Sequence, residues 1–169
     1  LSVPLRSRLI AAASRDRSPI VRTEVAAAAR LGDGPVDCRP ILAATGDRNP
    51  YVALTAVDSL GSGCADTAGA SRVLRKLATT GRNAGVLDHR WQMSAHALLA
   101  LARLDGAAAS TLLARLAHSE RPEVRVYAAR AAAAAEDRAT LRQLARDRDR
   151  NVEEAAITGL SATAGHDAD

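Results

Sequence analysis

A seven-residue pattern returns five times along the chain and constrains its fold more than any other feature. The pattern is Asp-x-x-Pro-x-Val-Arg, and its complete copy runs from Asp16 to Arg22. The other copies depart from it at one or more positions and begin at Asp47, Asp88, Ser119 and Asp147, which gives spacings of 31, 41, 31 and 28 residues. Repetition at this period indicates a stack of similar units rather than a single globular core.

An alanine-rich stretch with helical periodicity follows each copy. Apolar residues recur at offsets +4, +5 and +8 from the Val position of the pattern, which places them on one face of a helix. These residues are Val25, Ala26, Ala29, Ala56, Val57, Leu60, Ala97, Leu98, Leu101, Ala128, Ala129, Ala132, Ala156, Ile157 and Leu160. The proline suits the first turn of such a helix, and the aspartate before it can accept hydrogen bonds from the free N–H groups there.

A shorter helix is predicted ahead of each copy. The five segments are Pro4–Ala13, Val36–Thr45, Ser71–Thr80, Ala107–Ala117 and Ala139–Arg146. Neither helix of a unit can bury its apolar face alone, so neighbouring units must stack. The sequence therefore predicts an all-α fold of about five antiparallel helix pairs.

The pattern and its following Ala/Leu helix resemble the HEAT repeat, in particular the short HEAT-like repeats of bacteria. The units lie at about residues 1–33, 34–64, 65–105, 106–135 and 136–164, followed by a frayed tail at 165–169. The resemblance implies a right-handed α-solenoid, or superhelix, whose second helices line the concave side. It also implies that the Asp and Arg of the pattern link neighbouring units, a role that maps to Asp16, Arg22, Asp47, Arg125 and Asp147. The third and fifth copies lack the proline, and the second, third and fifth lack the arginine.

Charge and composition narrow the possible partners. A net charge of +4 would suit a nucleic-acid binder. However, acidic residues are interspersed with the arginines and aromatic residues make up only 2% of the chain, so a solvated surface of mixed charge is the favoured interpretation. No stretch approaches the roughly 18 consecutive apolar residues of a membrane span. Because the chain opens with Leu1 rather than Met, we expect it to be a fragment or a processed form of a longer protein.

The two cysteines, Cys38 and Cys64, fit no metal-ligand spacing, and no histidine cluster accompanies them. Two reduced thiols are the favoured interpretation. Helix pairing would nevertheless bring both residues to the same end of one helical hairpin, so a disulfide is the alternative. The compartment stays open: the cytoplasm is slightly favoured, and a disulfide would indicate the periplasm.

No motif for catalysis is present. The chain has no nucleophile elbow, no H-E-x-x-H zinc motif and no glycine-rich phosphate loop. We therefore expect no catalytic residue, metal site or cofactor here, although an enzymatic domain could lie elsewhere in a longer parent chain.

Side chains of the second helices that point away from the apolar face are candidates for partner binding. Offsets +2, +3, +6 and +10 from the Val position point this way, and the candidates chosen from them are Thr55, Asp58, His96, Leu99, Arg103, Tyr127 and Arg130. Tyr and Arg often anchor protein interfaces, although ordinary exposed helix positions account for them equally well. Trp91 is added because it follows extra chain at about residues 81–87, which is either a tolerated insertion or a binding element. Local packing of Trp91 against that insertion is the favoured interpretation.

The predicted function is that of a non-catalytic scaffold. The concave face would bind a protein partner or another domain of the same parent chain. The alternative is a nucleic-acid-binding protein similar to HEAT-like DNA glycosylases, which hold duplex DNA in a basic groove. Those enzymes are expected to place aromatic residues and a catalytic acid there, and this chain lacks that set. Neither a membrane nor a small-molecule substrate is predicted as a partner.

Overall fold

The computed structural model describes residues 3–28, 37–80 and 90–164, and these residues form ten α-helices and no strand. The odd-numbered helices are α1 (Val3–Ala13), α3 (Cys38–Ala44), α5 (Thr67–Thr80), α7 (Gly106–Leu116) and α9 (Arg138–Leu144). The even-numbered helices are α2 (Pro19–Ala28), α4 (Pro50–Leu60), α6 (Arg90–Leu104), α8 (Pro122–Ala134) and α10 (Arg150–Ala164). The all-α prediction is confirmed, and α5 begins at Thr67 rather than at Ser71. The insertion at 81–87 and the tail at 165–169 lie outside the described residues.

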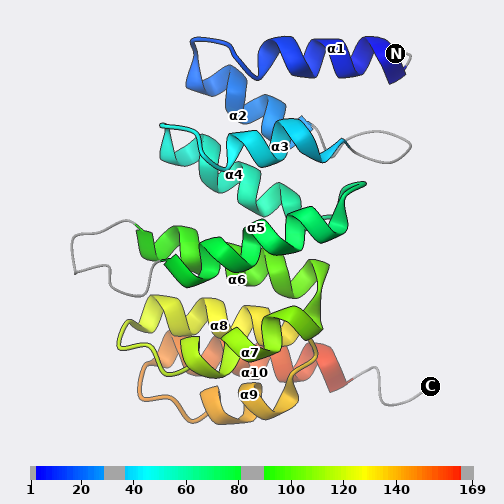
Figure 1. Ribbon diagram of the computed structural model, residues 1–169. Coiled ribbons are helices and arrows are strands. Elements are labelled where there is room, and N and C mark those ends of the chain that lie inside the picture. The colour runs from blue at the N-terminus through cyan, green and yellow to red at the C-terminus, as the bar shows by residue number, and fades with distance from the viewer. Residues whose placement is uncertain (1–2, 29–36, 81–89, 165–169) are drawn as a thin grey trace.

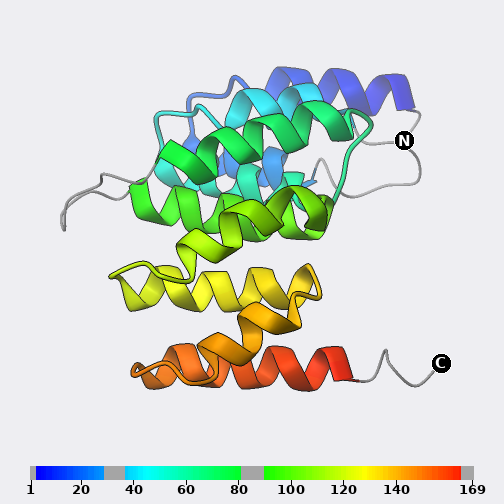
Figure 2. The ribbon, with the colours of Figure 1, turned by 60° about the horizontal axis from the view of Figure 1, so that its bottom comes forward.

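Consecutive helices pack as pairs, and the pairs follow one another from α1 at the top of Figure 1 to α9 and α10 at the bottom. Each even-numbered helix packs closely against the next even-numbered helix, whereas successive odd-numbered helices pack far less extensively. Figure 2 shows α6, α8 and α10 roughly parallel, one below another. The even-numbered helices therefore form a continuous layer through the stack.

The predicted apolar offsets form most of the core between the helices. In α4, α6 and α8 all nine residues are buried: Ala56, Val57, Leu60, Ala97, Leu98, Leu101, Ala128, Ala129 and Ala132. In α10 the prediction is wrong for Ile157, which is 49% exposed. The residues at the same offset in α4, α6 and α8 are buried, and each of those helices packs against a following even-numbered helix, which α10 lacks in the described part of the chain.

Small side chains let the even-numbered helices approach closely. Gly61 follows α4, and a Cβ atom at this position would lie 2.7 Å from the Cα atom of Ala100 in α6. At Gly159 in α10 it would lie 3.0 Å from the Cβ atom of Ala133 in α8, and 2.8 Å from Cδ2 of Leu141 in α9. At Gly61 the contact is with the backbone of α6, so a larger residue would push α4 and α6 apart, because protein interiors are packed to near-crystalline density.

Two arginine–aspartate pairs connect successive helix pairs, and we call each an arginine clasp. In the first, Arg22 of α2 donates from Nε and Nη2 to the Asp47 carboxylate at 2.7 and 2.9 Å. In the second, Arg125 of α8 donates in the same way to Asp147 at 2.7 and 2.8 Å. These hydrogen bonds lower the pKa of both aspartates and raise the pKa of both arginines.

The aspartate of the pattern does not cap the helix that follows it, which corrects the prediction. Its carboxylate instead accepts a hydrogen bond from the backbone N–H two residues later, from Asn49 onto Asp47 at 2.8 Å. Asn49 then caps α4 by accepting from the N–H groups of Tyr51 and Val52. The aspartate lies three residues before the proline and two before the N-cap residue, too far out to reach the free N–H groups of the first turn.

The cysteines form a disulfide, so the prediction of two reduced thiols was wrong. Cys38 is the first residue of α3, and Cys64 lies in the turn between α4 and α5. Their Cα atoms are 5.4 Å apart, within the range that a disulfide requires. The antiparallel pairing of α3 and α4 brings the start of one helix beside the end of the other, and this creates the contact.

Candidate functional site

A line of polar side chains crosses three even-numbered helices, and we call it the polar chain. It consists of Asp58 in α4, His96 in α6, and Tyr127 and Arg130 in α8. The Asp58 Oδ1 atom lies 2.8 Å from Nδ1 of His96, and Nε2 of His96 lies 2.8 Å from the Tyr127 hydroxyl. The guanidinium carbon of Arg130 lies 5.4 Å from the centre of the Tyr127 ring, within the range of a cation–π contact.

The repeat register explains why these side chains meet. Asp58 occupies offset +6 from the Val position of its unit, and His96 and Tyr127 occupy offset +3. Since the even-numbered helices run in the same direction and pack side by side, the two +3 residues lie at adjacent levels of the layer, and Asp58, about one turn further along α4, contacts His96. The polar chain is therefore a consequence of the repeated geometry.

The hydrogen bonds fix where the protons lie at neutral His96. An ionised carboxylate only accepts, so Nδ1 of His96 carries the proton and donates to Asp58. Nε2 then accepts from the Tyr127 hydroxyl. Burial raises the pKa of Tyr127, which keeps this hydroxyl protonated. The arrangement orients the imidazole and the phenol, but it does not generate a phenolate nucleophile.

The outer parts of this face are charged and accessible. Arg103 at the end of α6 and Arg130 are exposed, and the Asp58 side chain is 44% exposed. The imidazole of His96 is 22% exposed, since it lies between its two partners. The polar chain thus carries an exposed cation, Arg130, and a partly exposed anion, Asp58, at the two ends of the half-buried His96–Tyr127 contact.

The remaining predicted residues have different environments. Thr55 is half-buried, three residues before Asp58. Leu99 is only 9% exposed and belongs to the core, so its assignment to the binding face was wrong. It lies on α6, which α4 and α8 flank on both sides, and this packing encloses it. Trp91 is half-buried in the first turn of α6, where the guanidinium carbon of Arg121 lies 6.0 Å from its ring centre. The predicted contact of Trp91 with the insertion lies outside the described residues.

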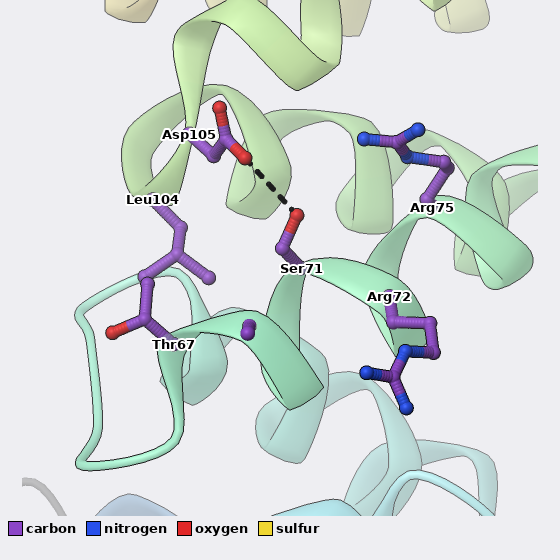
Figure 3. Close-up of a pocket in the computed structure, with 7 residues that line it drawn as sticks. Thr67, Ser71, Arg72, Arg75, Leu104 and Asp105 are labelled. Carbon is purple, nitrogen blue, oxygen red and sulfur yellow. Dashed lines mark hydrogen bonds between the residues drawn. The ribbon is translucent and has the colours of Figure 1, made fainter.

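A recess that was not predicted from the sequence lies between α5 and the turn that joins α6 to α7 (Figure 3). It is a pocket of about 650 Å³ in which the Ser71 hydroxyl donates to Oδ2 of Asp105 at 3.2 Å. Arg72 and Arg75 line the same recess, but their guanidinium groups point in different directions. Asp105 also caps α7 by accepting from the N–H of Ala108. This recess has no convergent set of ligand-binding groups.

In the described part of the chain, no group of three or more His, Cys, Asp or Glu side chains is placed to hold a metal ion. None of the described helices combines the length and the hydropathy needed to cross a bilayer. No protein-family model matches the chain, and no significant match is found among curated proteins.

Proposed function

We propose that this protein is a non-catalytic scaffold for protein interactions. In this proposal the helix pairs form a right-handed α-solenoid of HEAT-like repeats, and the even-numbered helices line its concave face. The close packing of the even-numbered layer supports this assignment, because the more closely packed layer of a curved stack lies on the inside. That face binds a protein partner or another domain of the same polypeptide.

The observation that carries the proposal is the polar chain. Its members hold one another in place, because the Tyr127 hydroxyl donates to His96 and His96 donates to Asp58. Side chains that are ordered before binding lose less conformational entropy when a partner arrives. Tyr and Arg are also the residue types that most often contribute large binding energies.

Charge favours a protein over a nucleic acid as the partner. Asp58 lies on the same face as Arg103 and Arg130, where a carboxylate would repel phosphate groups. A protein surface can present a carboxylate to each arginine and a donor to Asp58. We expect the partner to contribute acidic side chains near Arg103 and Arg130.

Site-specific photo-crosslinking tests the proposal. A photoreactive amino acid replaces Ala134, an exposed residue one turn beyond Arg130 on α8; the matched control replaces Ala139, an exposed alanine of α9. We expect a discrete protein adduct from position 134 and none from 139. Equal labelling from both positions, or specific nanomolar binding of labelled duplex DNA at near-physiological salt, would contradict the proposal.

The disulfide supports an oxidising compartment for this interaction. Structural disulfides persist outside the cytosol and are rare within it. The bridge between Cys38 and Cys64 therefore favours the periplasm or the cell exterior over the slightly favoured cytoplasm.

A further inference from the structure

The α1–α2 end of the stack leaves apolar side chains uncovered at positions that are buried elsewhere. Val21 of α2 is 37% exposed. The corresponding valines of later units are buried: Val52 is 0% exposed, Val124 is 5% exposed and Val152 is 0% exposed. Each of those three lies on an even-numbered helix that packs against the preceding even-numbered helix, and α2 has no such neighbour in the described part of the chain.

The same difference is found on α1. Leu5 and Leu9 lie one turn apart and are 47% and 53% exposed. The corresponding residues of α7, Ala108 and Leu112, are 9% and 7% exposed, and α7 packs against the preceding α5. Both helices of the first pair therefore carry the side chains of a packed interface without its covering layer.

Asp16 supplies the polar half of the same interface. It corresponds to Asp47 and Asp147, and its Oδ1 atom accepts from the Ser18 N–H at 2.7 Å, the same turn contact that they make. The carboxylates of Asp47 and Asp147 each also receive two hydrogen bonds from an arginine of the preceding even-numbered helix. Among the described residues, no arginine donates to the exposed Asp16 carboxylate.

A second copy stacked head to tail does not match this surface. At the α10 end, Glu153 occupies the position that Arg22 and Arg125 hold in their units, and it is exposed. Head-to-tail stacking would place Glu153 against Asp16, two carboxylates at the site of a clasp. Like charges in this position would destabilise the contact.

We propose that the surface formed by Leu5, Leu9, Val21 and Asp16 docks a further alanine- and leucine-rich helix pair whose second helix carries an arginine. The arginine forms a clasp with Asp16, and the apolar face of the pair covers the three exposed side chains. This surface lies at one end of the stack and is separate from the face that carries the polar chain. The two arginine clasps inside the molecule show the geometry that the docked pair adopts.

An extended chain tests the docking. A second copy of residues 106–135, which form α7 and α8 and include Arg125, is added ahead of Leu1 as the probe. We compare Asp16→Ser in the extended and the original chain. Serine keeps the turn contact, as Ser119 does at the equivalent position by accepting from the Arg121 N–H, but it removes the carboxylate.

We expect Asp16→Ser to lower the melting temperature of the extended chain by roughly 5 °C more than that of the original chain. Arg125→Ala in the added copy alone should give the same loss, and combining the two changes should add little. Equal effects of Asp16→Ser in both chains, or an added pair that unfolds in its own separate transition, would overturn the proposal. Dimerisation of the original chain that Leu9→Asp abolishes would also overturn it, since a second copy would then be the occupant.

Discussion

Replacing Arg125 with alanine tests whether the arginine clasps stabilise the stack. The Arg125 side chain is 8% exposed and that of Asp147 is 11% exposed. Arg125 donates two hydrogen bonds to Asp147 and two more to the carbonyl oxygens of Ser119 and Glu120, at 2.7 and 3.2 Å. The substitution leaves the Asp147 carboxylate without its arginine partner in a site that little water reaches. Removing one partner of a buried pair costs about 3–5 kcal/mol, whereas an exposed pair contributes about 0–1 kcal/mol.

We expect a loss of about 3 kcal/mol for Arg125→Ala, near the lower limit for buried pairs. Asp147 still accepts from the Asp149 N–H, so its carboxylate keeps one partner. For a chain of this size the loss corresponds to a fall in melting temperature of roughly 6–12 °C. Thermal and urea unfolding measure it.

Arg142→Ala is the matched control, because it removes an exposed arginine of α9 and should change stability by no more than about 0.5 kcal/mol. A double-mutant cycle with Asp147→Ala then isolates the pair. The double variant should lose less than the sum of the two single variants. An Arg125→Ala variant as stable as Arg142→Ala, or strictly additive single losses, would refute the reasoning.

Three further predictions concern acid, the disulfide and a glycine. The arginine hydrogen bonds lower the folded-state pKa of Asp147, so the ionised Asp147 stabilises the fold fully above its unfolded-state pKa of about 4, and this stabilisation is lost as the pH falls below that value. In Arg125→Ala, the free energy of unfolding should therefore fall less steeply as the pH is lowered through this range. Denatured, unreduced protein should show no free thiol, and reduction of Cys38–Cys64 should cost roughly 3 kcal/mol of stability, whereas two free thiols would rule out the bridge. Gly61→Ala should destabilise the protein by about 1–3 kcal/mol in thermal unfolding. The control Gly46→Ala should be close to neutral, because the nearest atom to the new Cβ lies 3.7 Å away. Equal effects of the two substitutions would show that α4 and α6 lie farther apart than the structure places them.

The sequence predicted the helices well because its signals are local and repeated. Offsets +4, +5 and +8 identified the buried face of α4, α6 and α8, and the prolines marked where α4 and α8 begin. The offset prediction failed at Ile157, because burial at that position depends on a following helix rather than on the residue itself.

The candidate site was predicted only as a set of positions on one face. Asp58, His96, Tyr127 and Arg130 were all identified, but their mutual contacts depend on how far each even-numbered helix shifts relative to the next. Leu99 was misassigned because its helical offset did not show that neighbouring side chains bury it. The proximity of Cys38 and Cys64 was predicted correctly, but the favoured interpretation of two reduced thiols was wrong, because sequence spacing does not reveal the redox state of two cysteines.

The central claim is that the layer of even-numbered helices binds the protein partner. Its most direct test is to measure the affinity of the crosslinked partner for charge-reversed variants. Arg103→Glu with Arg130→Glu reverses two exposed charges on the even-numbered layer, and Arg142→Glu with Arg146→Glu makes the same change on and just after α9. The proposal predicts that the first pair raises Kd by about tenfold or more without lowering the melting temperature, and that the second pair leaves Kd nearly unchanged. Equal Kd values for the two double variants would contradict the assignment of the even-numbered face as the binding surface.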